Sequence, residues 1–197
     1  MAVATLRESR RLQMRTGILD AARRKFEALG VAAATTQDVA EEAGVSHGSV
    51  FAHFKSRPAL VCALVDRVLD QAETTLARPD PSRQGLGEAL QAHLAALSEI
   101  EPIYARLVVE RPLLPPSAQA RMAGFDAAVA RLLQAAARDG LREGVRPYFA
   151  FNAWMGLVAY YLANREVFSP GGAVLRQRSG ELVENFLGLV ARVRSPG

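Results

Sequence analysis

The chain has 197 residues, of which 50% are hydrophobic and 22% are charged. These proportions are typical of a packed globular protein and exclude an intrinsically disordered one. A single cysteine, Cys62, excludes an intrachain disulfide, and the longest apolar stretch, residues 148–163, is interrupted by Asn152 and is shorter than the roughly 20 residues that a bilayer requires. Because the N-terminus also has no apolar signal segment, we expect a cytoplasmic protein rather than a transmembrane or secreted one.

The positive charge lies close to the N-terminus. The net charge is +4, and residues 1–25 hold seven basic and two acidic side chains, so residues 26–197 together carry −1. This asymmetry is typical of a chain that contacts a polyanion with one end. A solvated helix face gives the same pattern, so charge alone does not distinguish the two.

The composition predicts helices almost throughout. Ala, Leu, Arg, Glu and Gln dominate, and no stretch keeps a period of two, so we expect an all-α fold of about nine helices. The expected helices cover residues 9–29, 37–43, 47–53, 58–77, 87–100, 102–110, 117–139, 147–165 and 174–193. In the first helix, one apolar stripe is expected from Leu12, Leu19, Ala22, Phe26 and Leu29.

Two short helices follow the first one and are separated by Gly44. Helices of this length are not stable alone, so they must pack on each other and on the first helix. Thr35 or Thr36 is expected to cap one and Ser46 the other, and Gly44 permits a left-handed turn between them. The pattern is that of a helix-turn-helix, whose second helix enters the major groove of DNA, although a capped helical hairpin without that function has the same spacing.

The first turn of the second short helix contains only small or polar residues, Ser46, His47, Gly48 and Ser49. Ser and Gly are weak helix formers, so stability does not explain this choice. A helix N-terminus that approaches DNA closely does explain it, because its free N–H groups and positive dipole end favour phosphate.

A family resemblance decides between these alternatives. Residues 36–57, with Thr36 at their start, Gly44-Val45-Ser46 in their middle and a final aromatic-rich stretch, resemble the DNA-binding domain of the TetR family of bacterial transcriptional regulators, and residues 18–30 resemble that family's first helix. The resemblance implies a three-helix helix-turn-helix domain over residues 1–56 and a larger helical effector-binding and dimerisation domain over residues 57–197. The family usually has tyrosine where Phe51 stands.

The resemblance also implies a set of DNA contacts. The expected residues are Arg10, Arg11, Arg15, Thr36, Gln37, Ser46, His47, Gly48, Ser49, Phe51, His53 and Lys55. Within this set, His47 and Ser49 would contact base edges, with Gly48 permitting the close approach. Phe51 would offer its ring to a thymine methyl group or a sugar edge. The three arginines would attract DNA of any sequence, the segment before the first helix would reach the minor groove, and the remaining residues would contact phosphate or cap the helix.

The larger half is unusually aromatic near its end. Seven of the thirteen aromatic residues fall between residues 148 and 168. The last two long helices are broadly apolar, and they form either the core of a monomer or the four-helix bundle of a homodimer, which paired DNA half-sites favour. Candidate effector-binding residues are His93, Tyr104, Met122, Phe125, Trp154, Met155, Tyr160 and Tyr161. The same residue types at helical spacing also form ordinary cores.

The predicted function is that of a ligand-responsive repressor, as the resemblance implies. It would leave a palindromic operator in double-stranded DNA when a small molecule binds the C-terminal domain, and few acidic residues at buried positions favour an uncharged, apolar effector. The alternative is a DNA-bound architectural or protein-interaction factor without an effector. The sequence has no nucleotide-binding loop and no metal-ligand spacing, so we expect no enzyme, no metal and no cofactor, and Cys62 is expected to be a buried structural residue.

Overall fold

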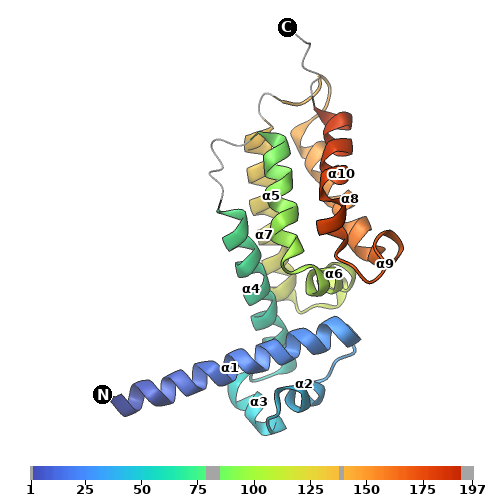
Figure 1. Ribbon diagram of the computed structural model, residues 1–197. Coiled ribbons are helices and arrows are strands. Elements are labelled where there is room, and N and C mark those ends of the chain that lie inside the picture. The colour runs from blue at the N-terminus through green and yellow to red at the C-terminus, as the bar shows by residue number, and fades with distance from the viewer. Residues whose placement is uncertain (1, 79–84, 138–139, 192–197) are drawn as a thin grey trace. The chain divides into compact units, whose positions relative to one another are not determined.

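The computed structural model describes residues 2–78, 85–137 and 140–191, and within them every regular element is helical apart from one isolated bridge between Leu141 and Ala191 (Figure 1). The elements are α1 (Ala2–Leu29), α2 (Thr36–Ala43), α3 (His47–His53), α4 (Arg57–Leu76), α5 (Leu86–Ser98), α6 (Glu101–Val109), η2 (Arg111–Leu113), α7 (Pro116–Ala136), α8 (Pro147–Ala163), α9 (Arg165–Phe168) and α10 (Val174–Val190). The expected all-α fold is therefore confirmed. The ends predicted at residues 139 and 193 lie outside the described residues.

The helices differ from expectation at two places. α1 begins at Ala2 rather than near residue 9, because residues 2–8 contain no helix breaker, and the segment expected to be an arm before the helix is therefore part of it. The predicted helix 147–165 is two helices, α8 and the four-residue α9, which meet at Asn164. None of the helices in the described ranges spans enough apolar residues to cross a membrane.

The apolar stripe predicted for α1 is partly wrong. Leu12 and Leu29 have 60% and 50% of their surface exposed. The buried side of α1 is instead formed by Ile18, Leu19, Ala21, Ala22 and Phe26, which recur with helical spacing over the second half of the helix. The side chains of residues 6–14, in the N-terminal half of α1, are therefore all exposed.

The chain divides into two compact units. The first contains residues 1–67 and 109–121, and the second contains residues 68–108 and 122–197. α4 and α7 thus contribute residues to both units. The division groups residues 109–121 with the short helices, which the sequence-based boundary at residues 56 and 57 does not do, and that boundary stays a prediction.

In the first unit, the turn between α2 and α3 follows the expected chemistry. Gly44 has φ +66°, and the N–H of Val45 donates to the carbonyl of Ala40 at 3.0 Å, which ends α2 in a left-handed turn. Ala40 is buried, as a close helix crossing requires.

The second unit has its core between α5, α7, α8 and α10, which lie side by side in Figure 1. α8 buries Ala150, Trp154, Val158 and Leu162, which recur every four residues. The N-terminus of α10 is fixed by the buried carboxylate of Glu101, which accepts hydrogen bonds from the N–H groups of Val174 at 2.6 Å and Leu175 at 3.0 Å.

Candidate functional site

The exposed edge of the two short helices is held by its own hydrogen bonds. Thr35 caps α2, its hydroxyl accepting from the N–H of Asp38 at 3.1 Å while the Asp38 carboxylate accepts from the N–H of Thr35 at 2.7 Å. These Thr35 bonds lower the pKa of Asp38 below its ordinary value. Ser46 caps α3 by accepting from the N–H of Ser49 at 3.1 Å. Both helices therefore begin at fixed positions on the same edge.

Three of the predicted DNA contacts form one row across this edge. The hydroxyl of Thr36, at the start of α2, lies 2.9 Å from Nε2 of His47, at the start of α3. The ring of His47 meets the ring of Phe51 edge to face, with centroids 4.9 Å apart. The three side chains are thus ordered before any partner arrives, and the aromatic contact explains how Phe51 keeps a fixed orientation without a tyrosine hydroxyl.

The other predicted contacts of this edge are solvent-accessible. Gln37, Ser46, Gly48 and Lys55 are exposed, and Ser49 is half-buried with its hydroxyl 2.8 Å from that of Ser46. Gln37 donates to Glu41 at 2.9 Å, so its amide is engaged along α2.

The basic side of α1 adds to this surface. Arg10, Arg11 and Arg15 lie on one side of the helix, and the guanidinium of Arg15 stacks over Phe54 at 4.7 Å. The pKa of the half-buried His53 is lowered, first by burial and then by the positive charges of Arg11 and Arg15. Arg11, Arg15 and the end of α3 at His53 therefore lie together in a region of positive charge.

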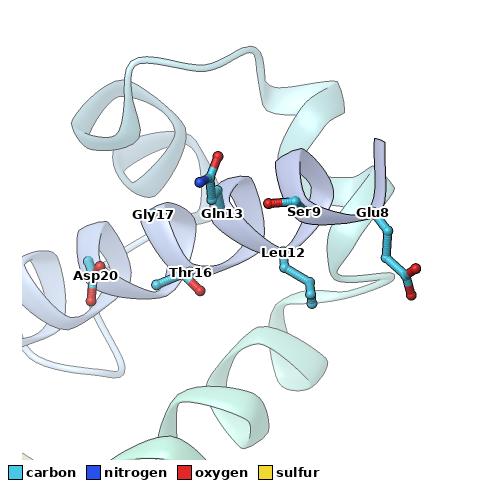
Figure 2. A pocket seen from close by; sticks show the side chains of 7 residues that line it. All are labelled: Glu8, Ser9, Leu12, Gln13, Thr16, Gly17 and Asp20. Carbon is cyan, nitrogen blue, oxygen red and sulfur yellow. The ribbon is translucent and has the colours of Figure 1, made fainter. Parts of the chain in front are cut away.

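The opposite side of α1 is different in character. An open groove of about 610 Å³ runs along it, lined by Glu8, Ser9, Leu12, Gln13, Thr16, Gly17 and Asp20, and Figure 2 shows these side chains following the helix. The lining contains two carboxylates and no basic group. Of these two carboxylates, that of Asp20 is paired with the guanidinium of Arg67 at 2.6 Å.

The connection from α1 to α2 is held by charged side chains from two distant segments. The carboxylate of Glu110 accepts from the N–H groups of Val31 at 3.1 Å and Ala32 at 2.6 Å. The guanidinium of Arg57 donates to the carbonyls of Val31 and Ala34, the latter at 3.1 Å. Sequence reasoning missed both residues, because their partners are backbone groups far away in the chain.

The predicted effector-binding residues separate into two groups. His93, Tyr104, Met122, Phe125 and Trp154 are buried together in the second unit. Ring contacts join His93 to Phe125 and Trp154, and Tyr104 to Phe125.

The remaining predicted effector-binding residues lie elsewhere. Tyr160 is 58% exposed and packs with Tyr161 on Phe168, and Met155 is half-buried. The structure therefore does not bring the two tyrosines into the buried group.

A small cavity adjoins the buried group. It is lined by apolar residues of α5, α7, α8 and α10, among them Leu90, Leu133, Trp154 and Phe186, and by Leu141 from the segment before α8. Its volume is about 10 Å³, which is about the space one water molecule needs. Of its lining residues only Trp154 was predicted, because leucines and alanines give no signal that separates a cavity wall from core.

Glu101 and Cys62 differ from expectation in how deeply they are buried. Glu101 is a buried acid, 2% exposed, and burial raises the pKa of its carboxyl although the N–H groups of Leu175 and Val174 oppose the rise. Cys62 is half-buried rather than buried, with its sulfur 3.0 Å from the hydroxyl of Ser117.

Comparison with known proteins identifies the fold and relates one segment of the chain to a known family. Residues 18–64 match the family described as "Bacterial regulatory proteins, tetR family". Over this segment the chain is similar to the TetR family. The curated relatives that match this segment are described as HTH-type transcriptional regulators.

Among relatives, the chain is 40% identical over 74 residues to the probable HTH-type transcriptional regulator ArpR and 41% identical over 70 residues to the HTH-type transcriptional regulator TtgR, both of Pseudomonas putida. These matches span 38% and 36% of this chain and only about a third of each relative, 35% and 33%. A TetR-family regulator from Agrobacterium tumefaciens has the same fold, with a TM-score of 0.73 at 20% identity over 92% of this chain and 100% of that one.

Proposed function

We propose that the protein is a cytoplasmic, homodimeric transcription regulator that binds a palindromic DNA operator and leaves it when a small apolar molecule binds the second unit. The observation that carries the DNA-binding part is the ordered row of Thr36, His47 and Phe51 at the start of α2 and α3. His53, at the end of the same α3, lies within reach of the positive charges of Arg11 and Arg15. A helix N-terminus with small neighbours and nearby cations suits a major groove and its phosphates.

The exposed face of α8 supports the homodimer. Five exposed residues at helical spacing, Phe149, Ala153, Gly156, Tyr160 and Ala163, form an uncharged stripe on the side of the helix away from Trp154. α10 packs beside α8 and exposes Leu189. An apolar stripe of aromatic and small residues suits close packing against a second copy of itself.

Ligand response rests on the second unit, and one observation favours the alternative. A cavity of about 10 Å³ is too small for an organic molecule without rearrangement, which favours an architectural factor that has no effector. Against it, Nε2 of the buried His93 has no hydrogen-bond partner among the described residues, which a filled structural core would avoid.

Selection from a random pool of double-stranded DNA tests the proposal. We expect enrichment of an inverted repeat whose half-sites are about one helical turn apart. Selection with His47→Ala is expected to alter the preferred bases. Failure to enrich any sequence contradicts sequence-specific binding, and a single half-site contradicts the dimer. If the protein stays bound to the operator in the presence of every compound that binds the second unit, the architectural alternative is supported.

Sedimentation of Phe149→Glu and Tyr160→Glu tests the dimer separately. A carboxylate within the stripe is expected to shift the protein to monomers at micromolar concentration, because a buried charge without a partner is costly. Tyr148→Glu is the matched control, since Tyr148 is 70% exposed on the same helix but lies outside the stripe. Equal behaviour of all three variants rules out α8 as the interface.

A further inference from the structure

The interior of the second unit contains an imidazole whose hydrogen bonding is half complete. Among the described residues, His93, Glu101 and Ser169 are the buried polar or charged ones. Glu101 is satisfied by backbone N–H groups, and Ser169 donates to Gln177 at 2.5 Å. His93 is fully buried, and its Nε2 has no hydrogen-bond partner in the part of the chain that the structure describes.

The tautomer of His93 follows from its one partner. The indole Nε1 of Trp154 lies 3.0 Å from Nδ1 of His93. An indole nitrogen is a donor only, so Nδ1 must be the acceptor and the ring proton must lie on Nε2. Burial lowers the pKa of His93 to about 4, so the ring is neutral at physiological pH. Nε2 is therefore a buried N–H donor that lacks an acceptor.

Trp154 lines the apolar cavity and bonds Nδ1 of His93, whereas His93 itself is not part of the cavity wall. The indole of Trp154 belongs to the cavity wall with Leu90, Leu133 and Phe186, and its N–H is bound to His93. His93 in turn contacts Phe125 of α7, and Trp154 contacts Phe186 of α10 with ring centroids 5.0 Å apart. A molecule that widened the cavity at Trp154 would thus separate helices on both sides of it.

We propose that His93 and Trp154 form the specificity element of the effector site, and that the effector is an apolar ring compound with one hydrogen-bond acceptor, such as a ketone oxygen, that accepts from Nε2 of His93. This inference rests on the proposed ligand response and adds to it the chemistry of the ligand. Burying an unsatisfied N–H costs free energy, which an acceptor in the ligand recovers. Because one ring exceeds the cavity, binding and helix displacement are one event, as a ligand-driven change requires.

Matched pairs of compounds test the acceptor directly. The pairs are 1-indanone and indane, acetophenone and ethylbenzene, and benzophenone and diphenylmethane, each a ketone and a hydrocarbon of similar shape. Binding is followed by the emission of Trp154, the one tryptophan of the chain, and by the melting temperature. Transfer out of water alone favours the hydrocarbons. We expect at least one ketone to bind about tenfold or more tightly than its partner.

Two variants locate the effect. His93→Leu is expected to abolish the ketone preference, and His93→Gln, which keeps a donor and an acceptor, is expected to restore part of it. In the wild-type protein, the ¹⁵N resonance of the His93 ring is expected to shift with the ketone and not with the hydrocarbon. This measurement does not depend on whether the leucine variant folds.

The outcomes separate this inference from the proposed function. Equal binding of ketone and hydrocarbon, or a preference that persists in His93→Leu, overturns the role of His93, while release of operator DNA by those compounds would keep the ligand response. If no member of any pair changes the emission of Trp154 or the melting temperature, the ketone site is overturned. Operator binding, measured separately, would be unaffected.

Discussion

The connection from α1 to α2 in the first unit and the buried His93 of the second unit differ in how completely their polar groups are hydrogen-bonded. In the first unit, the carboxylate of Glu110 accepts from the backbone N–H groups of residues 31 and 32. The guanidinium of Arg57 donates to the backbone carbonyls of residues 31 and 34. In the second unit, His93 is fully enclosed with one nitrogen bound and the other unmatched. The hydrogen bonds of the α1–α2 connection fix the direction in which α2 leaves α1. A buried donor without an acceptor, in contrast, can contribute to the free energy of binding a ligand that accepts from it. The difference indicates that a segment that positions a helix needs its hydrogen bonds complete, whereas a recognition site needs a polar group that a ligand can complete.

The largest expected effect comes from the saturated carboxylate of the second unit. Glu101→Ala leaves the N–H groups of Val174 and Leu175 buried without acceptors. We expect a loss of about 4 kcal/mol in the free energy of unfolding, measured by urea denaturation. Glu184→Ala, an exposed change on the same α10, is the control and should stay within about 0.5 kcal/mol. Equal losses in both variants would show that Glu101 does not fix α10.

Acidification tests the state of His93. The unfolded chain binds this proton with a pKa near 6.5 and the folded chain with a pKa of about 4. Between these values the unfolded state holds more protons, so the contribution of His93 to stability is complete above pH 6.5 and is lost as the pH falls toward 4. The loss is on the order of 3 kcal/mol.

The difference between wild type and His93→Gln isolates this effect. The raised pKa of Glu101 acts in the opposite direction over part of the same pH range, and it is common to both proteins. Urea denaturation from pH 7 to pH 4 should therefore give a smaller loss in the variant. Parallel pH profiles would mean that His93 titrates normally and is not enclosed.

Removing the Glu110 carboxylate tests the saturated connection of the first unit. Glu110→Ala leaves the N–H groups of Val31 and Ala32 without their acceptor, and we expect a loss of about 2 kcal/mol because the site is only part-buried. Operator affinity should fall with it, since α2 would no longer leave α1 in a fixed direction. Unchanged operator affinity together with reduced stability would restrict Glu110 to a structural role.

The smallest expected effect is at the exposed Lys55. Lys55→Ala should weaken binding to all DNA sequences alike, by about 1 kcal/mol or less. It should also reduce the slope of log K against log salt by about one, as measured by fluorescence anisotropy. Arg131→Ala removes the same charge from an exposed position in the second unit and is the control. A change of sequence preference in Lys55→Ala would instead make it a base contact.

Local chemistry made much of the first unit predictable. Gly44, Ser46 and the threonine cap are determined by neighbours within four residues, so their conformations follow from residue type. Leu12 shows the limit of periodicity, because the helix continues past the core that its apolar stripe would join. The family resemblance, rather than any single motif, gave the division of roles.

Long-range pairings could not be predicted. Glu110 and Val31 are 79 positions apart, and His93 and Trp154 are 61 positions apart, so no local pattern relates them. Residue type alone predicts His93 and Trp154 as effector-binding or core residues. Their mutual hydrogen bond, and the donor that it leaves unmatched, depend on how α5 and α8 pack.

The ion pairs at the end of α1 determine how the basic segment would respond to salt. Arg23 pairs with Glu27, and Arg24 and Lys25 both pair with Glu42 of α2, so three of the seven cations in residues 1–25 are matched within the fold. The other four, Arg7, Arg10, Arg11 and Arg15, lie in the first half of the helix. If these four and Lys55 each displace one counterion from DNA, log K falls with log salt with a slope of about −4 to −5 per subunit. The salt-dependent part of DNA binding would therefore come mainly from the first half of α1. Physiological changes in ionic strength would then change operator occupancy as strongly as a weak effector.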